Sequence, residues 1–456
     1  MLMLAVAACS STSGVSPVRT VTSADLPRPC GQLECTGTLD GAAYQVRLPS
    51  RWNGTLLIWS HGYRQAMPAP PDFAPVETSA EAAPTDEVAQ LLLDEGYALA
   101  GSAYAKNGWA VDDGVKAAEN LYSWFKTNEG RPVRTYVWGV SLGGLITETL
   151  AESEPWVDGA LPMCGVLAGA NQTLDLALDG AFATKVLLAP SLQLVGYASY
   201  QDGVDAWVNA EKVIGQTATK GGNEGLAKLL LVAALVHPSA KTTTQDGSTA
   251  TSQLTAEATA LLTGLGYGTF DRWEFEQRVG GNASGNVGVD YSARVSVGDR
   301  ALIDALAPGR LNGWLAELQA APRVTPDPAA RTKADVLGNP TGSLRVPTVT
   351  LHTEFDDTVP VFEESVFAQR VNADKSRLSD VYQLYTAPPA SYTTAPYGAG
   401  HCNFNSNEFT GAVKVLDQWV RTGAYPWSQQ TTADFGTPTG LDLAYRPPPW
   451  PGSPAS

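Results

Sequence analysis

Gly139-Val140-Ser141-Leu142-Gly143 is the stretch of this sequence that decides the fold. It stands between residues 134–138, which predict a β-strand, and residues from 142 to about 151, which predict a helix. In a G-x-S-x-G turn of this kind, the small residues let the chain bend so sharply that the serine hydroxyl stands exposed above the strand. Because glycine-rich turns between strands and helices are common, the pentapeptide needs chemical partners elsewhere in the chain.

A general base can be sought by elimination, because the chain holds four histidines. His61 ends a predicted strand, His352 lies inside another, and His237 lies in an apolar run typical of a helix. His401 lies in the glycine-rich loop 397–402, just before what the pattern predicts to be the last amphipathic helix. A base that takes a serine proton and later protonates a leaving group fits such a loop better than a strand interior. We therefore predict His401 as the base, with a packing role in the loop as the alternative.

The acid is expected between the serine and the histidine in chain order, at the end of a strand. Residues 348–353 predict that strand, and the run 354–360 that follows it resembles the D-x-x-V-P acid motif of the α/β-hydrolase family. The resemblance implies Asp356 as the acid, with Asp357 and Glu354 as fallbacks. A solvated acidic turn, or a cap for the next helix, is the alternative.

The same resemblance implies the donors of an oxyanion hole. A serine hydroxyl is a weak nucleophile, so an imidazole must take its proton and a carboxylate must orient the imidazole. The charge that then develops on the substrate needs fixed N–H groups. The backbone N–H of Leu142 follows the nucleophile, and His61-Gly62-Tyr63 looks like the family's HG-x segment. We assign the second donor to the N–H of Tyr63 and a structural role to His61.

Short apolar strands alternate with amphipathic helices along the chain, which predicts an α/β fold. The resemblance implies a mostly parallel sheet of eight strands flanked by helices. The sixth and seventh predicted strands are about 180 residues apart, so a large and mainly helical lid is expected between them. The expected division is a signal and tether, two parts of one core separated by the lid, and a Pro-rich tail that is extended or disordered, over residues 1–24, 25–165, 166–345, 346–425 and 426–456.

Composition limits the partners. The 456 residues are 44% hydrophobic and 17% charged, as expected of a globular core, and the net charge of -16 argues against nucleic acid. The sequence contains no P-loop, dinucleotide fingerprint or zinc-binding spacing, so we expect no cofactor and no metal. Membrane contact is expected only through a lipid anchor at the N-terminus.

The N-terminus predicts export. Residues 4–9 end in Cys9 and resemble the lipobox of bacterial lipoproteins, in which the cysteine is lipidated, and a tether rich in Ser, Thr, Gly and Pro follows. The segment lacks a charged beginning and its apolar run is short, so an apolar N-terminus with an incidental cysteine is the alternative. We expect a bacterial cell-surface lipoprotein or a secreted protein.

Four further cysteines agree with an oxidising compartment. Cys30 and Cys35 enclose four residues and could form a local bridge. The ends of the strands near Cys164 and Cys402 are close in an α/β-hydrolase sheet, so the resemblance implies a bridge between these two, although four cysteines allow three pairings. The His-Cys step also resembles the tannase and feruloyl esterase family, whose second cysteine directly precedes the serine. Val140 occupies that position here, so aromatic-ester specificity is not implied.

Together these patterns predict an exported serine hydrolase that cleaves carboxylic ester bonds, in a small molecule or a polymer, through an acyl-enzyme. One alternative is a serine peptidase of the prolyl or aminopeptidase type, for which Glu274 and Glu276 could bind a free amine. A second alternative is a non-catalytic surface protein that binds ligands on the same scaffold.

Overall fold

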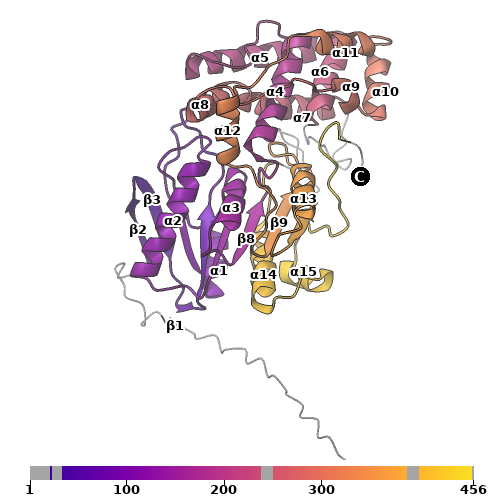
Figure 1. Ribbon diagram of the computed structural model, residues 1–456. Coiled ribbons are helices and arrows are strands. Elements are labelled where there is room, and N and C mark those ends of the chain that lie inside the picture. The colour runs from indigo at the N-terminus through magenta and orange to yellow at the C-terminus, as the bar shows by residue number, and fades with distance from the viewer. Residues whose placement is uncertain (1–20, 23–32, 238–249, 388–399, 454–456) are drawn as a thin grey trace, which may run out of the picture.

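The computed structural model describes residues 21–22, 33–237, 250–387 and 400–453 (Figure 1). Its main sheet has eight strands. They are β2 (Glu34–Leu39), β3 (Ala42–Arg47), β5 (Thr55–Ser60), β6 (Ala98–Ser102), β7 (Arg134–Val140), β8 (Gly159–Met163), β9 (Thr348–Thr353) and β10 (Val381–Thr386). The order across the sheet is β10-β9-β8-β7-β5-β6-β3-β2. Neighbours from β10 to β6 run parallel, whereas β3 runs antiparallel to both β6 and β2. The predicted mostly parallel sheet is therefore confirmed.

Helices cover both faces of this sheet. One face packs against α1 (Asp86–Asp94) and α14 (Ser406–Thr422), and the other packs against α2 (Val111–Asn128) and α3 (Leu142–Ser153). Alternate side chains of a strand point to opposite faces, and in β5 Ile58 joins the α2 and α3 side while Trp59 joins the α1 side. All six residues of β5 are buried, which explains its uninterrupted apolar sequence. A separate two-stranded sheet pairs β1 (Val21–Thr22) with β4 (Arg51–Trp52).

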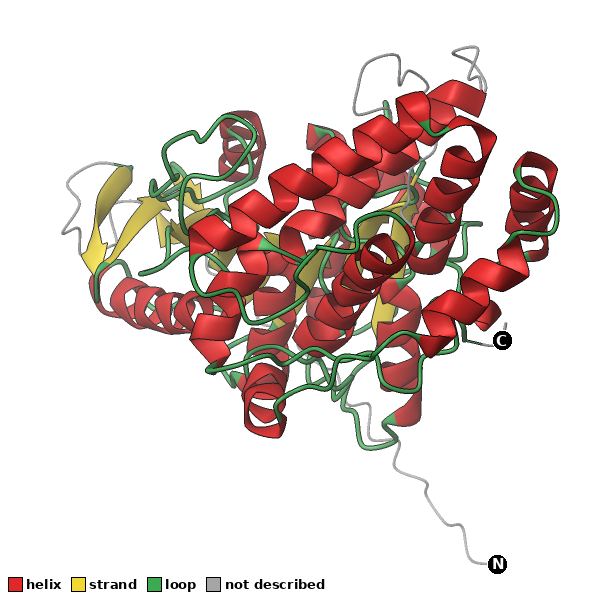
Figure 2. Ribbon diagram, turned by 90° about the horizontal axis from the view of Figure 1, so that it is seen from above, coloured by secondary structure: helices red, strands yellow, loops and turns green. Residues whose placement is uncertain are grey.

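Between β8 and β9 the described residues are mainly helical. The helices are α4 (Gly169–Leu187), α5 (Tyr200–Lys220), α6 (Gly222–Val236), α7 (Ala250–Tyr267), α8 (Phe270–Val279), α9 (Tyr291–Arg294), α10 (Val297–Leu306), α11 (Leu311–Ala320) and α12 (Pro328–Val336). We call residues 169–336 the helical insertion. It has an apolar core of its own, which includes Phe182, Leu231 and Trp314. In Figure 1 it lies above the sheet, and Figure 2 shows from above that its helices extend over the strands.

The C-terminal part differs from expectation. After α13 (Glu363–Ala373), β10 and α14, the chain forms a further helix, α15 (Ser428–Phe435). The prediction that α14 is the last helix, and that the tail is extended from residue 426 onward, is wrong for this segment. The reason is packing: Phe435 is buried, and a Cβ on Gly411 of α14 would lie 2.7 Å from its Cα. Farther along, the Trp450 ring packs edge-on against Phe362.

The described helices also bear on membrane association. Among residues 21–22, 33–237, 250–387 and 400–453, none of them is both long and apolar enough to cross a bilayer.

Candidate active site

Ser141 lies in a strained turn at the carboxyl end of the central strand β7. Its backbone angles are φ 57° and ψ −124°, between the last residue of β7 and the first of α3. Left-handed φ values are strained for residues other than glycine and persist where the surrounding structure enforces them. The flanking glycines are required by close approach: a Cβ would lie 2.0 Å from the Ser60 carbonyl oxygen at Gly143 and 2.5 Å from it at Gly139. The predicted G-x-S-x-G turn is thus built where β7 passes the end of β5.

The loop after β5 passes directly beside Ser141. A Cβ on Gly62 would lie 3.2 Å from the Ser141 Cβ atom. Leu142 is the first residue of α3, and the N–H of such a residue has no acceptor within its own helix. Tyr63 and Leu142 line the same cavity as Ser141. The structure therefore places both predicted oxyanion residues next to the serine, while the role of their N–H groups stays a prediction.

His61 is held as a structural residue. Its side chain is buried and its ring stacks on Tyr104 at a centroid distance of 3.9 Å. The Tyr104 hydroxyl donates to the His61 carbonyl oxygen at 3.0 Å. Burial, together with the nearby charge of Arg64, lowers the pKa of His61 to about 4, so the imidazole is neutral at pH 7. This environment agrees with its predicted role in shaping the loop.

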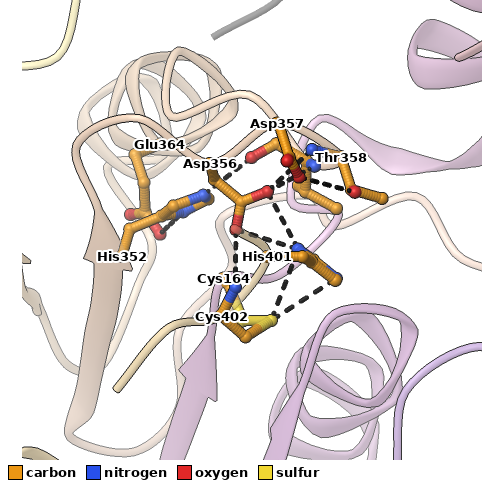
Figure 3. Close-up of a disulfide and its surroundings, with 9 residues drawn as sticks. Cys164, His352, Asp356, Asp357, Thr358, Glu364, His401 and Cys402 are labelled. Carbon is orange, nitrogen blue, oxygen red and sulfur yellow. Dashed lines mark hydrogen bonds and ion pairs between the residues drawn. A yellow bond between two sulfur atoms is a disulfide. The ribbon is translucent and has the colours of Figure 1, made fainter. Parts of the chain in front are cut away.

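Asp356 and His401 form a bonded pair. The Nδ1 atom of His401 lies 2.8 and 2.9 Å from the two carboxylate oxygens of Asp356 (Figure 3). Asp356 is fully buried and also accepts backbone N–H groups of Thr358, Val359 and Cys402 at 2.8 to 3.0 Å. Burial alone would raise the pKa of Asp356, but the charge and hydrogen bond of His401 outweigh burial and lower it. An ionised carboxylate in this position can fix the tautomer of the imidazole.

The fallback acids occupy different surroundings. Asp357 accepts the Thr358 hydroxyl at 3.1 Å and lines the cavity beside Ser141. Burial and the neighbouring Asp356 raise the pKa of Asp357, which disfavours a second negative charge there. Glu354 donates its backbone N–H to the carbonyl of Thr386, at the end of β10. Of Asp356 and Asp357, the structure pairs Asp356 with His401.

A disulfide links the His401 loop to the strand beside Ser141. Cys164 directly follows β8 and is bonded to Cys402 over a Cα–Cα distance of 5.5 Å. The Ser141 N–H donates to the carbonyl of Met163, the residue before Cys164, at 3.0 Å. The pairing implied by the resemblance is therefore present. Cys30, and with it the expected bridge to Cys35, lies outside the described residues, as does Cys9.

The serine and the histidine are brought to neighbouring strand ends without bonding to each other. Within the described part of the chain, no hydrogen bond joins the Ser141 hydroxyl to His401. The two ring nitrogens of His401 lie 3.4 and 3.5 Å from the Cys402 sulfur, so the ring rests against the disulfide (Figure 3). Catalytic hydrogen bonds are often long in ligand-free enzymes and tighten when substrate binds.

His352 takes a place that sequence reasoning missed. Elimination set it aside as the interior of a strand, but its Nε2 atom lies 2.9 Å from the carbonyl oxygen of Val359, whose N–H holds Asp356. Its Nδ1 atom lies 3.3 Å from Glu364 (Figure 3). Burial would lower the pKa of His352, but the hydrogen bond and charge of Glu364 outweigh it and raise the pKa. The available signal was a histidine on the strand that leads directly into the acid loop.

A cavity of about 830 Å³ opens beside Ser141. Its size falls within the range of small-molecule sites. Core residues contribute one side, and α4, α6 and α7 contribute the other through Leu174, Ala177, Gly180, Val236, Leu261 and Leu265. The helical insertion therefore covers the serine with apolar side chains. Sequence reasoning nominated none of these, because helical periodicity does not tell a cavity wall from ordinary core.

A metal ion does not fit the one cluster of possible ligands found in the described residues. Ligand atoms of Cys164, Asp356, His401 and Cys402 lie within 4.8 Å of one another. The two cysteines are joined as a disulfide and offer no thiolate, which is the form of cysteine that binds metals.

The two acids proposed for an aminopeptidase lie elsewhere. Glu274 accepts the N–H of Trp109 at 2.9 Å and the Arg278 guanidinium at 3.1 Å. Glu276 accepts the N–H of Gly196 at 2.9 Å. Neither residue lines the cavity beside Ser141, so the observation that would favour an aminopeptidase is not made.

Comparison with known proteins finds distant hydrolases. No family model matches the chain. It is 25% identical to an o-phthalyl amidase from Xanthobacter agilis over 427 residues, which cover 85% of this chain and 87% of that protein. The amidase is thus similar over most of both lengths.

Solved structures give lower identities. An acylaminoacyl peptidase from Pyrococcus horikoshii is 8% identical with a TM-score of 0.39, and the match covers 87% of this chain and 43% of that one, less than half. Feruloyl esterase B from Aspergillus oryzae is 16% identical with a TM-score of 0.38, over 89% and 86% of the two chains. An alpha/beta hydrolase enzyme from a Medee basin deep-sea metagenome library is 10% identical with a TM-score of 0.36, over 86% and 99%.

Proposed function

We propose that this chain is a serine hydrolase that cleaves carboxylic ester bonds. The observation that carries the proposal is the convergence of three strand ends: the strained Ser141 after β7, the disulfide after β8 and the bonded Asp356–His401 pair after β9. In parallel sheets, active sites form at the carboxyl ends of strands. The nearby cavity gives an acyl group a place beside the serine.

The reaction follows from the proposed roles. His401 Nε2 takes the hydroxyl proton of Ser141 as the oxygen attacks the ester carbonyl, and Asp356 holds the Nδ1 side of the ring. The oxyanion accepts hydrogen bonds from the N–H groups of Leu142 and Tyr63. Collapse of this intermediate breaks the bond to the alcohol, which takes its proton from His401 and leaves an acyl-Ser141 ester. Water, deprotonated by His401, then releases the acid and restores the serine.

Amide hydrolysis is the second candidate. It is favoured by the similarity to the o-phthalyl amidase, at 25% identity over most of both chains. The same residues serve both reactions, since an amide differs in its leaving amine, which needs a proton from His401 to depart. The pair of acids suggested for an aminopeptidase lies away from the cavity, which weakens the version of this candidate that binds a free N-terminus.

The proposal is tested by labelling and by substrate choice. A fluorophosphonate probe should modify Ser141, and the Ser141→Ala variant should show no adduct. p-Nitrophenyl esters of graded acyl length are then compared with aminoacyl nitroanilides under the same conditions. Hydrolysis of the anilides alone would replace the esterase proposal by a peptidase or amidase. Folded protein that neither reacts with the probe nor hydrolyses either series would favour a non-catalytic binding role.

We further propose that the protein works outside the cytoplasm, as a secreted or lipid-anchored protein. The Cys164–Cys402 bridge supports this, because structural disulfides persist in oxidising compartments. Lipidation at Cys9 is tested by fractionation of cells that express the full chain, followed by mass spectrometry of the N-terminal peptide. Unmodified Cys9 in a cytoplasmic fraction would contradict the proposal.

A further inference from the structure

We propose that the cavity beside Ser141 binds an uncharged aliphatic acyl group that extends between α4 and α7, and that Gly180 and Gly264 limit its length. This inference rests on the proposed function, because it takes Ser141 as the residue that receives the acyl group. It adds the chemical class of the acyl group and two specificity-determining positions.

The end of the cavity near Ser141 is marked by aromatic residues. Tyr63, in the loop beside the serine, packs edge-on against Tyr267 at the last turn of α7, with ring centroids 5.7 Å apart. The Tyr63 hydroxyl donates to Asp271 of α8 at 2.9 Å, which ties this loop to the helical insertion. Tyr63 and Tyr267 both line the cavity together with Ser141. The C-terminal end of α7 is therefore the end nearest the serine.

The far end of the cavity lies inside the helical insertion. A Cβ built on Gly180 of α4 would lie 3.5 Å from Val236 and 3.9 Å from Leu261, so these three residues close the cavity together. The lining residues run from Thr173 to Gly180 on α4 and from Ala260 to Tyr267 on α7. Seven residues of helix rise about 10 Å, which sets the depth that an extended acyl chain can use.

The lining excludes a charged acyl group. Among the described residues that line the cavity there is no Lys, Arg or His, and the one carboxylate is Asp357. A second carboxylate on the substrate would lose its hydration and meet no cation, which is strongly unfavourable. Away from the serine, the walls are aliphatic, with Leu174, Val236 and Leu261. This chemistry suits a hydrocarbon chain.

Two helical glycines keep the space open. Gly264 lies one turn before Tyr267, and a Cβ added there would meet no atom within 4 Å. A side chain at this position would therefore extend into the middle of the cavity without displacing its neighbours. A side chain at Gly180 would fill only the far end. Glycine lowers helix stability, so its presence within both α4 and α7 agrees with a need for space.

The experiment compares acyl lengths across variants. Wild-type protein, Gly264→Leu, Gly180→Leu and the matched control Gly215→Leu are assayed with acetyl, butanoyl, octanoyl and dodecanoyl p-nitrophenyl esters. Gly215 is an exposed residue within helix α5, and a Cβ there also meets nothing within 4 Å. A mono-p-nitrophenyl ester of phthalic acid, whose acyl group carries a carboxylate, serves as the charged arm. Urea unfolding of each variant shows that it is folded, and alanine replaces leucine where leucine does not fold.

We expect wild-type kcat/KM to be at least about tenfold higher for the octanoyl than for the acetyl ester, since each buried methylene contributes a several-fold gain. Gly264→Leu should lower the octanoyl-to-acetyl ratio about tenfold or more. Gly180→Leu should lower the ratio for the longest chain the wild type accepts and spare butanoyl, and Gly215→Leu should keep the wild-type ratios. Ratios that are unchanged in both cavity variants, or a phthalic monoester that outperforms the octanoyl ester, would overturn the inference.

A binding measurement separates this inference from the proposed function. Calorimetry with octanamide on the Ser141→Ala variant reports the cavity without any turnover. Octanamide binding that Gly264→Leu weakens by about tenfold or more supports the acyl pocket even where no ester is hydrolysed. Ester hydrolysis at Ser141 with no octanamide binding leaves the hydrolase proposal standing and rejects the acyl pocket.

Discussion

Removal of the Cys164–Cys402 bridge should destabilise the protein and slow catalysis together. The two cysteines are 238 residues apart, and the chain-entropy relation for a closed loop of that size gives about 5 kcal/mol of stabilisation at 25 °C. Measured effects of native disulfides are commonly smaller, so we expect about 3 to 5 kcal/mol. Because the bridge also fixes the residue after His401, a displacement of the imidazole should lower kcat by about tenfold or more while KM changes little.

The assay is a double-mutant cycle with Cys164→Ser, Cys402→Ser and the double variant. Each single variant already opens the bridge, so urea unfolding should show each of them losing nearly as much free energy as the double variant. Steady-state kinetics on the same four proteins reports the effect on kcat. Single losses below about 1 kcal/mol that simply add up in the double variant would show that the bridge does not stabilise the fold, and would refute the reasoning.

Three further changes test the site and its support. Asp356→Asn should lower kcat about 10⁴-fold, because the imidazole loses the tautomer it needs, and a loss below about tenfold in single-turnover kinetics would point to Asp357 instead. Burial raises the pKa of Asp271 to about 7, so the folded protein keeps a proton that the unfolded chain releases near pH 4. Stability should therefore fall by about 4 kcal/mol between pH 4 and 7, and Asp271→Asn should flatten that slope in urea unfolding; equal slopes would contradict it. Gly143→Ala places a Cβ 2.0 Å from the Ser60 carbonyl and should destabilise by more than about 3 kcal/mol, whereas Gly313→Ala, exposed in α11 with nothing within 4 Å, should be neutral or stabilising.

The sheet could be read from the sequence because its strands are buried on both faces. Such strands appear as uninterrupted apolar runs, and the run predicted over 381–386 is observed as β10 with the same bounds. The turn at Ser141 was also predictable, since the close approach of Ser60 leaves no room for a side chain at Gly139 or Gly143. Local sequence determines both features, and both were found.

Features that depend on distant packing were not predictable. α4 is buried on nearly all sides, so its sequence shows no apolar stripe, and no helix was assigned to it. α15 has a polar sequence and is held by Phe435 against α14, which the pattern of either segment alone does not reveal. Gly180 and Gly264 are read from sequence as weak points within helices, and only the fold shows that they border an open space.

The base and the acid of the proposed triad are held in different ways, and this difference explains why the bridge matters. Asp356 is fixed by backbone N–H groups of its own loop, which His352 in turn braces through the Val359 carbonyl. His401 is held by the carboxylate of Asp356 and by the bridge at its neighbour Cys402. Hydrogen bonds to a charged group depend on its ionisation, whereas a covalent link does not. The acid can therefore be placed by the fold alone, while the base depends on an oxidising environment to keep its second hold, so the compartment and the chemistry of this protein are physically coupled.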